Sequence, residues 1–99
     1  MNNFNELINS NTPVLVDFFA DWCGPCRYQA PILKEVAAQV EGLARVVKVD
    51  VDRNPAVAQA YGIRGIPALI IFRNGKVVWR ASGVKQASEL VAELTKAAA

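Results

Sequence analysis

Histidine is absent from this 99-residue chain, and cysteine occurs only twice, at positions 23 and 26. A zinc site takes four ligands, which usually come from two cysteine pairs or from cysteine together with histidine. A zinc site within one chain is therefore nearly excluded, and we expect no metal centre. The sequence also shows no internal repeat and no low-complexity linker that would divide it into separate units.

An excess of charge of one sign is missing as well. Eleven Lys and Arg residues and nine Asp and Glu residues are interspersed along the chain, and the formal net charge is +2. Domains that bind nucleic acid carry clustered basic residues on one face or along one helix. We therefore expect no nucleic acid among the partners.

Long hydrophobic runs are absent from the first part of the chain, where a targeting segment would lie. Asp17 interrupts the longest apolar stretch there, and the first residues lack the basic and apolar regions of a secretion signal. We expect neither export nor membrane insertion, hence a cytoplasmic protein. Hydrophobic residues make up 53% of the chain, enough for one core. Residues 1–99 are predicted to form a single domain, which we expect to be a monomer.

The two cysteines lie in the segment Trp22-Cys23-Gly24-Pro25-Cys26, directly after the apolar run from Val14 to Ala20. This places them at the junction of an expected strand and an expected helix. A disulfide needs Cα atoms within about 4.4–6.8 Å, and residues three apart on the first turn of a helix come close to that distance. The spacing predicts a pair that forms and opens a disulfide, so the expected chemistry is thiol–disulfide exchange.

The position of the two cysteines at the start of a helix should give their thiols different pKa values. Backbone N–H groups there have no acceptor within the helix, and together with the helix dipole they stabilise a thiolate and lower its pKa. Cys23 lies nearer that end, so we expect it to be the nucleophile. Cys26 lies one turn further along, and we expect it to be more shielded and to react second.

Two other interpretations of the pair stay open. A structural disulfide would close a loop of only a few residues, and a disulfide that closes so short a loop adds little to the stability of the fold. Two inert buried thiols would suit core positions better than a pair that brackets Gly-Pro in a turn. Exchange chemistry accounts best for the position of the pair.

Hydrophobic periodicity predicts alternating helices and strands. Strands separated by helices pair in parallel, whereas strands joined by a hairpin pair antiparallel, so the pattern predicts an α/β fold with a mixed sheet and helices on both faces. Asn74-Gly75 is a strong hairpin signal. The expected strands span residues 14–20, 45–51, 68–72 and 77–81. The expected helices lie near residues 4–8, 24–41 and 55–61, and a final helix after Gln86 has a buried stripe of Leu90, Val91 and Leu94.

These residues resemble the thioredoxin family over nearly the whole chain from Phe4 onward. The most specific features are the Trp-Cys-Gly-Pro-Cys segment at 22–26 and the segment Gly62-Ile63-Arg64-Gly65-Ile66-Pro67. The resemblance implies the thioredoxin fold, with a central mixed sheet flanked by helices on both faces. The family's first strand is missing here, which implies four strands and leaves the strand at 45–51 more exposed at an edge.

The resemblance also implies an activity, that of a general protein-disulfide reductase. Cys23 would attack a disulfide of a target protein to form a mixed disulfide, and Cys26 would resolve it. Asp17 would be a buried carboxylate that exchanges a proton with Cys26, with Lys48 modulating it. Burial within an apolar strand should raise the pKa of Asp17. The alternative for Asp17 is a solubilising residue at a wet edge. For Lys48, a surface lysine is the default without the resemblance.

A substrate groove follows from the same resemblance. Pro67 corresponds to the family's cis-proline and would present the backbone of Ile66 to an extended target segment, although sequence alone favours trans because only about 5–6% of X–Pro bonds are cis. An apolar groove of this kind suits docking of a strand by main-chain hydrogen bonds. Trp22 could otherwise be a core aromatic residue and Gly83 a plain turn glycine. The residues expected in the groove are Trp22, Gly24, Pro25, Ile66, Pro67, Gly83 and Val84.

The resemblance implies no bound cofactor. The expected partners are disulfide-containing proteins and a thioredoxin reductase that passes on electrons from NADPH. A disulfide oxidase or isomerase is a second interpretation, but the Gly-Pro dipeptide between the cysteines resembles the reducing members of the family. A third is a binding module that uses the groove to hold one partner, with redox activity incidental.

Overall fold

Strand β1 (Val14–Phe19) lies inside the sheet, between β2 (Arg45–Asp50) and β3 (Ala68–Arg73). It pairs in parallel with β2 and antiparallel with β3, and β4 (Lys76–Ser82) pairs antiparallel with β3. The computed structural model describes residues 2–99, and the strand order of its sheet is β2-β1-β3-β4. The predicted four-stranded mixed sheet is confirmed.

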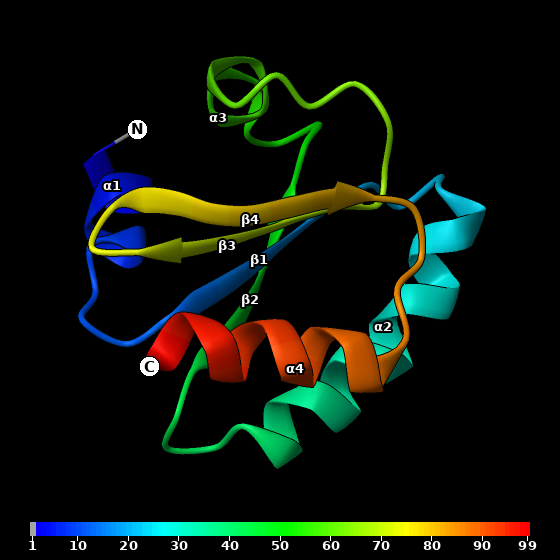
Figure 1. Ribbon diagram of the computed structural model, residues 1–99. Coiled ribbons are helices and arrows are strands. Elements are labelled where there is room, and N and C mark those ends of the chain that lie inside the picture. The colour runs from blue at the N-terminus through cyan, green and yellow to red at the C-terminus, as the bar shows by residue number, and fades with distance from the viewer. Residues whose placement is uncertain (1) are drawn as a thin grey trace.

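Helices cover both faces of this sheet, as Figure 1 shows: α1 (Asn2–Ile8) and α3 (Pro55–Ala60) lie on one side, and α2 (Gly24–Gln39) and α4 (Ala87–Ala98) on the other. The alternation of side chains along β1 explains the two layers. Val16 and Phe18 pack with α1 and α3, whereas Leu15 packs with Leu33 of α2 and Leu90 of α4. The apolar run thus feeds two cores at once, and both faces of the strand are buried.

Strand β2 lies at one edge of the sheet, as the resemblance predicts. Only Val49 is fully buried in it, and Arg45 and Lys48 are exposed. Arg45 N–H donates to Pro13 O and Val51 N–H donates to Phe19 O, so the odd-numbered residues turn their backbone groups toward β1. The even-numbered residues turn theirs outward.

The turn between β3 and β4 has the conformation that Asn-Gly favours. Asn74 has φ 54° and Gly75 has φ 79°, the left-handed region that a type I′ hairpin needs at both central positions. The turn is also anchored, because Asn74 N–H donates to Ser10 O and Gly75 N–H donates to Ile8 O. The predicted hairpin is confirmed.

Helix α2 begins at Gly24, directly after Cys23, and continues through Pro31 to Gln39. Its buried face holds Cys26, Gln29, Leu33 and Val36, at spacings of three and four residues. The sequence therefore places the second cysteine on the side of the helix that faces the sheet. None of the helices within residues 2–99 is long and apolar enough to cross a membrane.

Candidate active site

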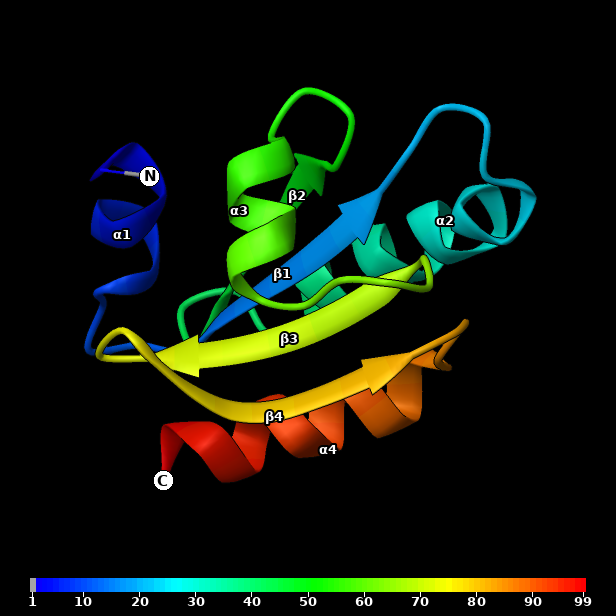
Figure 2. The same ribbon diagram turned by 90° about the horizontal axis from the view of Figure 1, so that it is seen from above.

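The two cysteines lie where the chain leaves the carboxyl end of β1 and turns into α2 (Figure 2). Open α/β sheets place their sites outside the carboxyl ends of the parallel strands, where loops meet. The turn is closed by a hydrogen bond of 3.1 Å from Cys23 N–H to Ala20 O. Cys23 is thereby held as the residue that caps α2.

Cys23 and Cys26 form a disulfide, and their Cα atoms are 5.3 Å apart. This separation lies within the usual range for a disulfide, so the predicted pairing geometry is confirmed. Cys26 N–H donates a hydrogen bond of 3.2 Å to Cys23 Sγ. A free N–H of the first helical turn is therefore directed at this sulfur, and in the reduced protein it would stabilise a Cys23 thiolate.

Shielding does not distinguish the two cysteines in the disulfide form. Cys23 is 4% exposed and Cys26 is 5% exposed, so the expectation that Cys26 is more shielded is wrong here. The reason is that another segment covers Cys23: its Sγ lies 3.7 Å from Ile66 O, and both cysteines pack in one cluster with Phe19 and Ile66. The two cysteines differ in their position at the helix start, because Cys23 is the N-cap of α2 and its Sγ accepts from Cys26 N–H.

Asp17 is fully buried in β1, and neither of its carboxylate oxygens has a hydrogen-bond partner among the described residues. Loss of solvation raises the pKa of this carboxyl from 3.8 to about 6, and the charge of Lys48 opposes the rise. The predicted rise of the Asp17 pKa is confirmed. The alternative, an Asp17 exposed to solvent at an edge of the sheet, is wrong. Asp17 shares a face with Leu15, the face that α2 covers, so it lies on the Cys26 side of the sheet.

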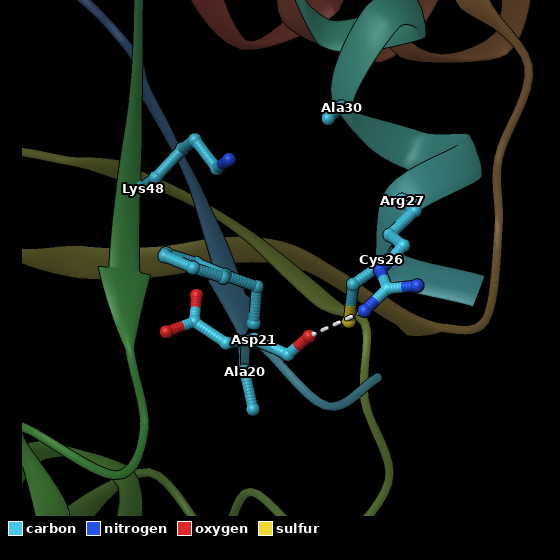
Figure 3. Close-up of a pocket in the computed structure, with 7 residues that line it drawn as sticks. Ala20, Asp21, Cys26, Arg27, Ala30 and Lys48 are labelled. Carbon is cyan, nitrogen blue, oxygen red and sulfur yellow. Dashed lines mark hydrogen bonds between the residues drawn. The ribbon is translucent and has the colours of Figure 1, made fainter. Parts of the chain in front are cut away.

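Lys48 lies beside Asp17 in the β1–β2 register, and it is exposed. Its Nζ lies 4.4 Å from the centre of the Phe19 ring, a cation–π contact. It also lines a pocket of about 160 Å³ with Cys26, and Figure 3 shows the two on opposite sides of it. The pocket is lined by Phe19, Ala20, Asp21, Cys26, Arg27, Ala30 and Lys48.

Part of the expected groove assembles around Cys23. The Ile66–Pro67 peptide bond is cis, and Pro67 O accepts a hydrogen bond of 2.8 Å from Gly83 N–H. Gly83 has φ 85°, a conformation that favours glycine. The structure thus joins Ile66, Pro67 and Gly83 next to the disulfide, with Val84 half-buried beside them in the chain.

The other expected groove residues lie on the surface at the start of α2. Gly24 and Pro25 are exposed in its first turn, and Trp22 is 68% exposed, so it is not a core aromatic residue. Trp22 Nε1 donates a hydrogen bond of 2.8 Å to Asp52 Oδ2, which fixes the indole against the segment after β2. Sequence reasoning missed Asp52, because nothing in the sequence pairs it with a residue thirty positions earlier.

Gln29 is a second residue that sequence reasoning missed. It is fully buried on the same face of α2 as Cys26, and its amide bonds to the backbone of Lys85. A signal was present, because position 29 falls on the apolar stripe of the helix and carries a polar side chain. Such a residue must find partners inside the fold.

The donor set of the site suits thiol chemistry rather than metal binding. Within the described residues, no three side chains of His, Cys, Asp or Glu come together in a way that could hold a metal ion. Two sulfurs at disulfide distance, a helix start and a buried carboxyl can store and release a pair of electrons with their protons.

The sequence of this chain is similar to those of known thioredoxins. The thioredoxin family model matches residues 1–96. Thioredoxin 1 of Nostoc sp. is 58% identical over 73 residues, covering 74% of this chain and 68% of that protein, and a Synechocystis sp. thioredoxin is 46% identical over 91 residues, covering 92% and 85%.

Solved structures agree. The thioredoxin of Malassezia sympodialis superimposes with a TM-score of 0.89 at 31% identity over 99% of this chain and 88% of that one. A mutant thioredoxin from Halobacterium salinarum gives a TM-score of 0.88 at 38% identity over 97% and 83%. The chain belongs to the thioredoxin family, and it is a thiol–disulfide oxidoreductase that reduces protein disulfides by dithiol–disulfide exchange.

Proposed function

We propose that the protein is a general reductant of protein disulfides in which Cys23 attacks and Cys26 resolves. The observation that carries this order is the hydrogen bond of 3.2 Å from Cys26 N–H to Cys23 Sγ at the start of α2. A thiolate is the attacking species in thiol–disulfide exchange, and this donor favours the thiolate at Cys23 over Cys26.

The exchange proceeds in two steps. The Cys23 thiolate attacks one sulfur of the target disulfide, so that a mixed disulfide forms and one target sulfur leaves as a thiolate, which takes up a proton. The Cys26 thiolate then attacks Cys23 Sγ, the mixed disulfide breaks, and the second target sulfur is released. The target gains two electrons, and the protein is left with the Cys23–Cys26 disulfide.

Asp17 is the proposed acceptor of the Cys26 proton in the second step. Its pKa of about 6 leaves it mostly ionised at neutral pH, and Lys48 tunes that value by its charge. The pocket lined by Cys26 and Lys48 lies beside the second cysteine, and we propose it as the side from which the proton reaches solvent.

We propose that the target docks as an extended segment along Trp22, Ile66, Pro67 and Gly83. Their position around Cys23 supports this, together with the backbone oxygen of Ile66 at 3.7 Å from Cys23 Sγ. A dithiol donor then restores the reduced protein, and we propose a thioredoxin reductase that uses NADPH. Such recycling suits a reducing compartment, so the proposed location is the cytoplasm and the proposed state is a monomer.

Two substitutions test the order of attack. Cys23→Ser should abolish insulin reduction with dithiothreitol as the donor, because no nucleophile remains at the helix start. Cys26→Ser should instead accumulate a covalent adduct with insulin chains, visible by non-reducing electrophoresis and lost on adding excess dithiothreitol. Undiminished turnover by Cys23→Ser, or an adduct that forms only through Cys26, would overturn the proposal.

A further inference from the structure

The side-chain amide of Gln29 closes a pair of hydrogen bonds with one backbone unit of a distant segment. Its Nε2 donates to Lys85 O at 3.0 Å, and Lys85 N–H donates to its Oε1 at 2.8 Å. A neutral amide offers a donor and an acceptor in one plane, as a peptide group does, so it can satisfy both backbone groups together. Gln29 itself is 0% exposed.

The segment that Gln29 holds is the one that follows β4 and includes Gly83 and Val84. At its other end, Gly83 N–H donates to Pro67 O at 2.8 Å. Residues 83–85 are therefore fixed at two points, to the cis-proline segment at one end and to the cysteine-bearing helix α2 at the other. Without the second point, this segment would keep the hydrogen bond from Gly83 to Pro67 but lose the two that join Lys85 to α2.

Gln29 lies one turn after Cys26 on the same buried face of α2. Its hydrogen bonds run to Lys85 only, so it does not take part in the exchange of sulfurs. Its side chain instead links the helix that carries both cysteines to the segment expected to contact the target.

We infer that Gln29 is a positioning residue that holds residues 83–85 in the shape that accepts an extended polypeptide, and so sets the affinity for protein disulfides. The inference rests on the proposed function, since it takes residues 83 and 84 as part of the docking groove. A small disulfide needs to reach only Cys23 Sγ, so its reaction should depend less on the shape of this segment. The role of Gln29 therefore distinguishes protein substrates from small ones.

Gln29→Met tests this, because methionine fills a similar volume but neither donates to Lys85 O nor accepts from Lys85 N–H in a comparable way. The variant is reduced, freed of reductant, and mixed with increasing insulin in one experiment and with 5,5′-dithiobis(2-nitrobenzoic acid) in another. The half-saturating insulin concentration should rise roughly tenfold, the effect of losing two neutral hydrogen bonds, with the maximal rate little changed. The rate constant with the small disulfide should stay within about twofold of the original.

A matched control is Val36→Ala, which removes apolar volume from the same face of α2 without touching Lys85. It should destabilise the protein yet leave the half-saturating insulin concentration unchanged. Amide hydrogen exchange gives a direct readout, because Lys85 N–H should lose protection in Gln29→Met and keep it in Val36→Ala. If Gln29→Met does not fold, Gln29→Asn, which is too short to reach both backbone groups, should show the same split.

An unchanged half-saturating insulin concentration in Gln29→Met would overturn the inference, as would an equal loss of rate with insulin and with the small disulfide. So would a rise in the half-saturating insulin concentration of Val36→Ala as large as that of Gln29→Met. These outcomes are distinct from a failure of the proposed function, in which the unsubstituted protein itself would not reduce insulin.

Discussion

Asp17 shows most clearly how a single residue links stability to function. A carboxyl that is fully buried without a hydrogen-bond partner is costly to ionise, and its pKa accordingly rises from 3.8 to about 6. The folded protein therefore holds this proton more tightly than the unfolded chain does. The fold thus retains a destabilising group, and in the proposed mechanism this group accepts the Cys26 proton.

The free energy of unfolding should consequently fall as the pH rises from about 4 to about 6. In this range the unfolded chain has lost the Asp17 proton while the folded protein still holds it, so raising the pH favours unfolding. Above the pKa of Asp17 in the folded protein, this carboxyl is ionised in both states, and the free energy of unfolding falls no further on its account. A rise of about two pKa units corresponds to about 3 kcal/mol.

Asp17→Asn should remove this pH dependence, because the amide does not ionise. At pH 7 the variant should be more stable than the unsubstituted protein by up to about 3 kcal/mol, measured by urea unfolding of the oxidised forms at pH 4 and pH 7. Glu6→Gln, at an exposed position on α1, serves as the control and should leave the difference between the two pH values unchanged. A variant that is less stable at pH 7 and keeps the slope of the original would refute this interpretation.

At the scale of elements, the start of α4 lacks a side-chain capping hydrogen bond. Gln86 is its N-cap with φ −78° and ψ 158°, the extended geometry of a capping residue, but its side chain makes no capping hydrogen bond. Serine in that geometry accepts from an N–H of the first turn, which is otherwise left to solvent.

Gln86→Ser should therefore stabilise the protein by about 1 kcal/mol, and the urea midpoint measures it. Gln86→Ala removes the glutamine without adding a cap and should give no such gain. Equal midpoints for the serine and alanine variants would show that a missing cap does not limit α4.

Much of the element pattern could be predicted from the sequence, because it is set by short-range rules. The nearly continuous apolar run predicted β1, Asn74-Gly75 predicted the hairpin, and Leu90 with Leu94 predicted the buried face of α4. The detail of a cap was less predictable. Asn54 is the N-cap of α3, but its side chain donates to Asp50 O instead of accepting from the helix. The residue type is typical of a cap, but it does not determine which hydrogen bond the side chain makes.

At the scale of the whole molecule, the site joins segments that lie far apart in the chain. Cys23 and Cys26 could be predicted because the motif is local. The contacts that complete the site are long-range: Ile66 over Cys23, Asp52 on Trp22, and Gln29 on Lys85. Sequence patterns alone do not report such contacts. The equal burial of the two cysteines has the same origin, since a distant segment provides the cover.

The proposed activation of Cys23 depends on the assembled fold, because its donor is an N–H of the first turn of α2. Alkylation of the reduced protein by iodoacetamide, followed by mass spectrometry across a pH series, measures it directly. In the folded protein, Cys23 should reach half its maximal rate well below pH 8.5, roughly the pKa of a free cysteine, and Cys26 should react later. In concentrated urea, both should follow the free thiol. If both cysteines of the folded protein instead follow the curve seen in urea, the helix start does not activate Cys23, and the proposed order of attack is wrong.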